Sequence, residues 1–127
     1  MAIYSDYKTI PGLVATGDLS SSQYLVVKAS STAGAVKVAT TKATDLALGI
    51  LQNDPASGEA AEVAYNGICK AIGAASISFG SKLSFNSTGQ VVATTTDKDE
   101  VVGIALAATS QAGDIIPVML SRFTLSE

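Results

Sequence analysis

The chain contains few residue types that could do chemistry. Histidine is absent from its 127 residues, so the commonest general base and a common metal ligand are missing. Serine triads and cysteine–histidine dyads of the usual type are therefore excluded within one chain. Ser81 and Lys82 could form a nucleophile–base pair, but adjacent residues on a strand point to opposite faces of a sheet. We expect no catalytic residue.

Carboxylates and the single cysteine complete the search for a reactive or metal-binding site. Glu59 and Glu62 lie close together in the chain, and a second acidic group falls within residues 97–100. The second group includes a lysine and lacks the internal glycine of an EF-hand loop, so we interpret it as a solvated turn. Cys69 lies in an apolar run, which favours a buried, inert thiol. The sequence therefore predicts no metal, no cofactor and no intrachain disulfide.

Charge and hydropathy exclude two classes of partner. The net charge is −3 and the eight basic residues are scattered, which argues against nucleic-acid binding. No apolar run approaches the ~18 residues of a membrane span, and the N-terminus shows no signal-peptide pattern. We expect a chain made in a reducing cytoplasm. Only 15% of the residues are charged, against about 25% in ordinary globular chains, which favours a surface buried against partner proteins.

Short β-rich runs separated by turn residues predict an all-β chain. Residues 53–58 carry the usual turn signals, with Pro55 fixing φ and Gly58 permitting a positive φ. No long segment shows a sustained helical period. Residues 66–67 read Asn-Gly, yet we interpret Gly67 as a bulge or close-contact point within one continuous strand. The expected strands cover residues 24–28, 36–40, 46–51, 62–70, 83–85, 90–95, 101–108 and 115–120.

Two stretches of the chain read alike. Four features recur at a spacing of 54 or 55 positions: a glycine before a β-branched run, a Gly-Ile pair, a Gly-acid turn and a valine. We therefore expect two similar β-units, at about 23–70 and 79–124, around a shared core. The structural turn and strand positions of the two units are Gly49, Pro55, Gly58, Glu59, Gly67, Gly103, Gly113 and Asp114.

The repeat also predicts matching roles for individual side chains. Glu59 and Asp114 each follow a turn glycine, where a carboxylate can accept backbone N–H bonds. Equivalent inward positions are expected for two pairs of residues: Val63 with Val118, and Ile50 with Ile104.

Residues 1–20 lie outside the repeat and carry apolar side chains without a regular period. We expect an extended N-terminal arm, followed by one β domain over residues 21–127. Such a segment cannot build a core alone, but it can become ordered on a partner surface. The residues expected to contact that partner are Ile3, Tyr4, Tyr7, Ile10 and Pro11.

Residues 48–68 resemble the signature of tailed-phage capsid decoration (cement) proteins. They contain an aliphatic-Gly-aliphatic-Leu-Gln-Asn strand, a Pro-x-x-Gly-Glu turn, and a Val-containing strand ending in Gly. The resemblance spans roughly residues 19–121. Its second half rests on residues 80–83, 89–93, 102–107 and 112–118.

The resemblance implies a small β-barrel or β-tulip that is a structural protein and not an enzyme. It implies a homotrimer, made in the host cytoplasm, on the outer surface of an expanded icosahedral phage head. There it would bind at three-fold or quasi-three-fold points and stabilise the shell of major capsid protein. The N-terminal residues named above would then contact the capsid or a neighbouring subunit.

Two other classes of function stay open at this point. A carbohydrate-binding β-module, displayed on a virion or secreted, needs exposed aromatic side chains; tryptophan is absent here. A small hydrolase-like enzyme needs a pocket with convergent polar groups, and the missing histidine argues against it.

Overall fold

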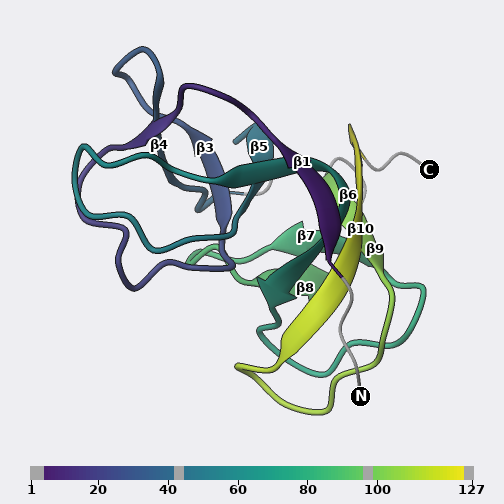
Figure 1. Cartoon of the computed structure of the whole chain (residues 1–127). Helices are drawn as coiled ribbons and strands as arrows, with labels where there is room; N and C mark the ends of the chain where they lie inside the picture. Colours follow the sequence, from purple (N-terminus) through teal and green to yellow (C-terminus); the bar gives the residue numbers. More distant parts are fainter. Residues whose placement is uncertain (1–4, 42–44, 96–98, 125–127) are drawn as a thin grey trace.

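The computed structural model describes residues 5–41, 45–95 and 99–124, and for residues 122–124 only the backbone. The expected contact residues Ile3 and Tyr4, and the lysine of the charged 97–100 group, lie outside the described residues. Within the described part there are ten strands and no helix, which confirms the all-β prediction (Figure 1). The strands are β1 (Asp6–Thr9), β2 (Val14–Ala15), β3 (Val26–Ala29), β4 (Ala35–Val38), β5 (Ala47–Leu51), β6 (Val63–Ile72), β7 (Lys82–Phe85), β8 (Val91–Ala93), β9 (Glu100–Ala105) and β10 (Ile115–Thr124).

All ten strands belong to one sheet. Its order is β2-β4-β3-β5-β6-β10-β9-β7-β8, and β1 pairs with β6 outside that path. β2 pairs with β4 in parallel, whereas the other pairs of named strands are antiparallel. In Figure 1, β3, β4 and β5 lie in the upper part of the molecule and β7 and β8 lie below them.

The sheet does not close into the expected barrel, because β2 and β8, its end strands, do not pair with each other in the described part. Each end instead curls back toward β6. An isolated bridge joins Val14 of β2 to Ala60, just before β6, and another joins Val91 of β8 to Gly73, just after it. The result is two curled half-sheets that share β6.

The buried apolar residues form two clusters: a larger one that both halves of the sheet share, as the repeat predicted, and a smaller additional one. The smaller one fills the first half-sheet and includes Val27, Leu51 and Val63. The larger one includes Ile50, Val118 and residues from both halves of the sheet. Consecutive residues of β5 therefore enter different clusters. A strand that is buried on both faces needs a continuous apolar run instead of alternation, as residues 46–51 show.

The two halves of the sheet share a strand order. β4-β3-β5-β6 is followed, in mirror order along the path, by β10-β9-β7-β8. Val63 and Val118 are both fully buried, whereas Ile50 is fully buried and Ile104 only partly. Ile50 is covered because the first half-sheet packs against the larger cluster. This order fits two similar units; their origin by duplication stays a prediction.

Two glycines at matching places allow neighbouring strands to approach. A Cβ on Gly49 of β5 would lie 2.0 Å from the carbonyl oxygen of Ala64, and one on Gly103 of β9 would lie 2.5 Å from that of Met119. Real Cβ atoms do not approach backbone this closely, so both positions require glycine. The turn glycine Gly58 differs, because it has a φ of 81° and open space around it.

Replacing Gly49 with alanine should lower the free energy of unfolding by about 3 kcal/mol, because the β5–β6 ladder must separate to admit the methyl group. Gly103→Ala should behave alike. Gly58→Ala is the matched control and should cost about 1 kcal/mol, from its positive φ alone. Urea denaturation measures all three. Equal losses at Gly49 and Gly58 would contradict the close approach.

Candidate functional site

The described residues contain no cluster that looks catalytic or metal-binding. No group of three or more Asp, Glu, His or Cys residues among them could hold a metal ion. Cys69 is buried, and desolvation raises the pKa of its thiol to about 12, which keeps it protonated and unreactive. In the described part, no helix could cross a membrane. The candidate sites that remain are the pockets and the exposed apolar side chains of the described residues.

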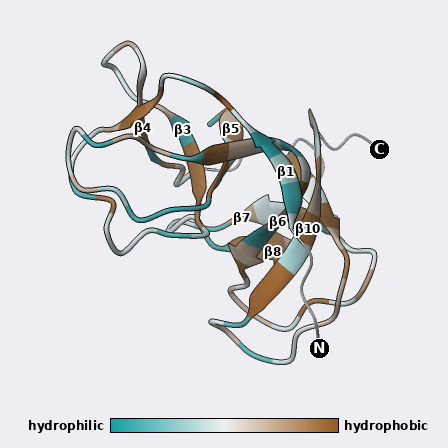
Figure 2. Cartoon of the chain, in the orientation of Figure 1, coloured by the Kyte–Doolittle hydropathy of each residue, from teal (hydrophilic) through white to brown (hydrophobic). Residues whose placement is uncertain are grey.

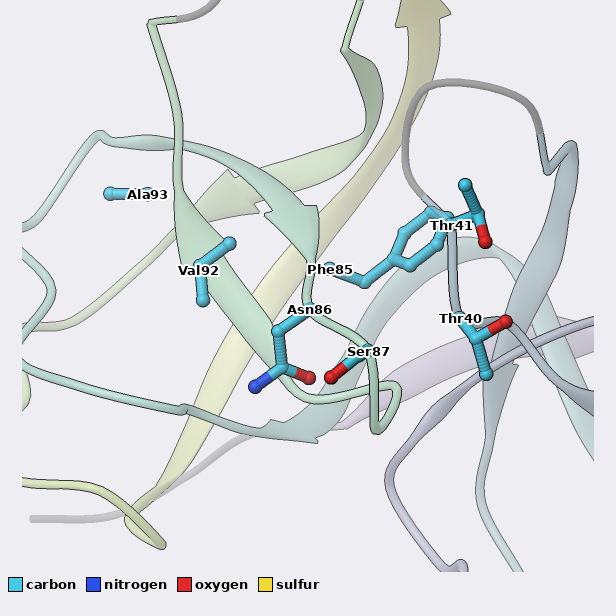
Figure 3. Close-up of a pocket in the computed structure, with 7 residues that line it drawn as sticks. All are labelled: Thr40, Thr41, Phe85, Asn86, Ser87, Val92 and Ala93. Carbon is cyan, nitrogen blue, oxygen red and sulfur yellow. The ribbon is translucent and has the colours of Figure 1, made fainter.

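A pocket of about 560 Å³ lies between the loop after β4 and the β7–β8 hairpin (Figure 3). Its described lining carries no charged side chain. Phe85, the aromatic residue in that lining, is fully buried, so its face is not free to stack on a sugar. The lining residues are Thr40, Thr41, Phe85, Asn86, Ser87, Val92 and Ala93.

Asp45 fixes one wall of this pocket. Its carboxylate accepts the backbone N–H groups of Thr40 and Thr41, each at 3.0 Å, and pairs with Lys28 at 2.9 Å. Burial raises the pKa of Asp45, but the bonds from Lys28 and the two amides outweigh it and lower the pKa below its ordinary value. The pocket wall is thus held by structural contacts and offers no catalytic group.

The turn before β6 is held by its own side chains. Asn53 donates to the carbonyl of Ala60 at 3.0 Å and accepts the N–H of Glu62 at 2.9 Å. Glu59 accepts the N–H of Ala56 at 2.8 Å. Asp114, which the predicted repeat aligns with Glu59, accepts the N–H of Ser110 at 3.4 Å. These carboxylates act on the backbone of their own turns.

Gln52 links β5 to the far half of β6. Its amide nitrogen donates to the carbonyl of Lys70 at 2.8 Å, and its amide oxygen accepts the N–H of Lys70 at 3.3 Å. The side chain thus supplies both bonds that a strand residue would make. Gln52 is buried, so these bonds satisfy groups that water cannot reach.

The same turn holds the N-terminal segment. The N–H of Gly58 donates to Ala15, the N–H of Ala15 donates to Glu59, and the N–H of Leu19 donates to Pro55, at 2.9 to 3.0 Å. Pro55 is buried, while Gly58 and Glu59 are exposed. Residues 13–19 are therefore attached to the sheet by backbone hydrogen bonds.

β1 attaches the segment further upstream. It pairs with β6, and a Cβ on Gly67 would lie 2.2 Å from the carbonyl oxygen of Asp6. β6 runs unbroken through Gly67, as the sequence predicted, and the ladder shifts beside it between Lys8 and Thr9. Gly67 has a φ of 105°. Its missing side chain lets β1 lie against β6.

Tyr7 and Ile10 contact their own chain. Tyr7 packs on the larger cluster and its hydroxyl donates to Glu62 at 2.5 Å. Ile10 packs on the smaller cluster, and its N–H donates to the carbonyl of Val63 at 3.0 Å. The segment before position 21 therefore joins the rest of the chain through β1, β2 and the packing of Tyr7 and Ile10; a domain boundary at residue 20 stays a prediction. Of the described contact residues that the sequence predicted, Tyr7 and Ile10 are partly buried and Pro11 is exposed.

Residues 9–14 form one side of a shallow pocket of about 380 Å³, which we call the N-terminal groove. Its other side comes from the segment that leads into β6. The groove is lined by Thr9, Ile10, Pro11, Gly12, Leu13, Val14, Asn53, Ala60, Ala61 and Glu62. It brings together two of the contact residues that the sequence predicted, Ile10 and Pro11, with Glu62.

A second surface was not predicted from the sequence. In the register of β6, β10 and β9, Ile68 pairs with Met119 and Met119 pairs with Ile104, while Ile72 pairs with Ile115. Directly paired residues lie on the same face of a sheet, so these five form one apolar face. Ile115 and Met119 are each 43% exposed, and the start of β10 is brown in Figure 2. Ile68 and Ile72 are four positions apart, an even spacing that puts both on one face of a strand; this was the signal that the sequence offered for the apolar face.

Comparison with known proteins identifies the relatives of this chain. A family model described as phage cement protein matches residues 11–120. The crystal structure of the N base of head fiber gp8.5 from bacteriophage phi29 is similar, with a TM-score of 0.69 and 19% sequence identity. The alignment covers 91% of this chain and 95% of that one; at this identity it shows a shared fold. The chain matches no curated protein.

Tyr7→Phe tests the bond that anchors β1. The hydrogen bond to Glu62, then burial and the charge of Glu62, raise the pKa of Tyr7 to about 12. The neutral hydroxyl is therefore favoured in the folded state, and its stabilisation is complete below about pH 10 and is lost as the pH rises through about 12. At pH 8 the variant should be less stable by about 1 kcal/mol. Urea midpoints of both proteins from pH 8 to 12 should converge; a constant difference would contradict the bond.

Deleting residues 2–12 should destabilise the protein, whereas an arm that only contacts a partner could be removed without loss of stability. The deletion removes β1 and the packing of Tyr7 and Ile10, for an expected loss of about 3 kcal/mol or more. Thermal and urea melts measure the effect, with circular dichroism to check that strand content remains. If the truncated chain keeps the wild-type stability, the segment is a separate arm after all.

Proposed function

Because the chain belongs to the phage cement protein family, and is thus a structural protein of the phage virion, we propose that it binds the outer surface of the expanded icosahedral head. We propose that it does so as a homotrimer at three-fold or quasi-three-fold sites. Its partners are then the major capsid protein and further copies of itself. Its action is to stabilise the shell.

The family match carries this proposal, because it covers residues 11–120 and so nearly the whole described sheet. The chemistry of the described residues is consistent with it. The described lining of the pocket between the loop after β4 and the β7–β8 hairpin carries no charged side chain, and large apolar side chains are exposed, among them Phe79 at 72%. Exposed apolar groups on a chain with few charges are typical of protein–protein contacts.

The charge of the chain supports the outer surface as its location. A packaged genome presents a dense array of phosphates, and proteins that lie against it carry clustered Lys and Arg. This chain has a net charge of −3. An acidic chain would be repelled by the genome but is compatible with the solvent-facing side of the shell. We accordingly propose no nucleic-acid or membrane partner.

Stabilisation follows from binding one state of the shell in preference to the other. A ligand that binds the expanded shell and not its dissociated or unexpanded states adds a free energy that grows with ligand concentration over Kd. A trimer at a three-fold point contacts several capsid subunits at once. Its second and third contacts then form at a high effective concentration, so modest individual contacts can hold neighbouring subunits together.

The N-terminal residues predicted from the sequence, Ile3, Tyr4, Tyr7, Ile10 and Pro11, remain our proposed contacts with the capsid or a neighbouring subunit. Tyr7 and Ile10 also have structural roles, so Tyr4 is the better residue to test. Tyrosine is enriched among the few residues that dominate binding at an interface. Tyr65 offers a matched control, because it is an exposed tyrosine on β6.

Tyr4→Ala should weaken binding to expanded heads at least tenfold, as loss of an anchor of about 2 kcal/mol would, whereas Tyr65→Ala should not. Co-sedimentation with heads that lack this protein measures the affinity of each variant, for heads before expansion and for heads after it. The wild-type chain should bind expanded heads only, and bound heads should survive heating that disrupts bare ones. Absence of wild-type binding to expanded heads would contradict the proposed function.

A further inference from the structure

Two exposed apolar surfaces lie toward opposite ends of β6. The N-terminal groove lies beside its start, where Ile10 bonds to Val63 and the lining includes Glu62. The apolar face of Ile68, Ile72, Ile104, Ile115 and Met119 lies over its second half. Val63, which Ile10 contacts, and Ile68, at the nearer edge of the face, are five residues apart on β6, which is roughly 17 Å at about 3.3 Å per residue. The two surfaces of one molecule therefore cannot cover each other.

The groove combines apolar side chains with acidic groups. Val14, which is 36% exposed, and Pro11, which is exposed, both line it. Glu62 is in the lining, and Glu59 and Asp54, both exposed, belong to the adjoining turn. The lining itself contains no basic residue. Lys8 lines a different, smaller pocket together with Asp6.

The apolar face has lysines within and beside it. Lys82 of β7 pairs with Ile104. Lys70 of β6 pairs with Pro117, and this pair lies between the pairs Ile68–Met119 and Ile72–Ile115. The nitrogen of Lys70 lies 6.0 Å from the centre of the Tyr24 ring. Asp6 pairs with Ile68 at one corner, and the Asp114 carboxylate is turned into its own loop by Ser110 and Gln111.

We infer that these two surfaces bind each other between copies: the N-terminal groove of one molecule takes up the apolar face of the next. This inference rests on the proposed homotrimer and names its contact. The two surfaces match in apolar character. The acids around the groove would meet Lys70 and Lys82 of the neighbouring copy, which fixes orientation and excludes groove-to-groove contact.

A contact between two different surfaces is head-to-tail. Such contacts produce a closed ring when the rotation between copies closes, and every copy in that ring uses both surfaces once. In this arrangement Ile115, Met119, Pro11 and Val14 become buried in the assembly. The same arrangement places the N-terminal segment of each copy at the junction with its neighbour.

The test uses one variant on each surface of the full chain, studied without capsid. Met119→Glu places an acid on the face that must meet acids, and Val14→Lys places a base in the groove that must meet lysines. Each substitution is at an exposed position, and Pro11→Lys is a second groove variant in case Val14→Lys does not fold. Each should reduce self-association at least tenfold in sedimentation velocity. Leu46→Glu, 62% exposed just before β5, is the control and should leave it unchanged.

Mixing the variants gives the sharper result. The Met119→Glu protein keeps an intact groove and the Val14→Lys protein keeps an intact face. In an equimolar mixture the intact groove of one variant can bind the intact face of the other, so the mixture should associate at least tenfold more strongly than either variant alone. Thermal melts of each variant confirm that it is folded before mixing.

Three results would overturn the inference. They are a groove variant that self-associates like the wild type, a mixture that stays monomeric, and a wild-type chain that is monomeric at all concentrations tested. A monomeric wild-type chain would also contradict a homotrimer that forms before capsid binding. The first two results leave the proposed function standing, because binding to expanded heads is measured separately. Failure of head binding with the groove–face contact intact would instead contradict the proposed function and leave this contact standing.

Discussion

The position of β6 between two clusters of buried apolar residues is the constraint on which the rest of the structure depends. β6 pairs with β1, β5 and β10, and its consecutive residues Val63 and Ala64 enter different clusters. Removing this strand from the sheet would expose both clusters together. The side chain of Gln52 extends the pairing to Lys70 beyond the end of β5. Stability and surface shape therefore depend on the same ten residues.

Missing side chains make this arrangement possible. Gly49 and Gly67 each lie where a Cβ would meet the backbone of a neighbouring strand. The core is built from Val, Ile, Leu and Ala with few aromatic residues, so its side chains fill little volume. Because neighbouring strands approach closely at the glycines, less space is left for side chains to fill. A thin core also leaves apolar groups such as Met119 and Ile115 without cover from the same chain. In a protein of the cement family, such exposed apolar side chains are suited to contact with a partner protein.

Local patterns were sufficient to predict the all-β class, most strands, the turn at Pro55–Gly58 and the close contact at Gly67. Each depends on neighbours in sequence and on the special backbone freedom of glycine or the fixed φ of proline. Long-range features were not predictable in this way. Tyr7 finds Glu62, 55 positions away, and nothing in the irregular spacing of residues 1–20 signals that partner. Ile50 and Ile104 occupy matching places, yet only tertiary packing decides that the first is covered.

The candidate surfaces show the same division. Ile10 and Pro11 were predicted as contact residues because they are apolar and lie outside the repeat. Both line the N-terminal groove. It missed the apolar face, because Ile68, Met119 and Ile104 come together only through the register of three strands. Surfaces built from cross-strand pairs require that register, which one sequence does not supply.

An electron cryomicroscopy map of heads from the phage that encodes this chain tests the central claim most directly. The account predicts ten-stranded density on the outer surface of the expanded shell, with three copies around each occupied three-fold or quasi-three-fold point. Density for this fold inside the shell, or an expanded shell saturated with the protein that shows none on its outer surface, would contradict it.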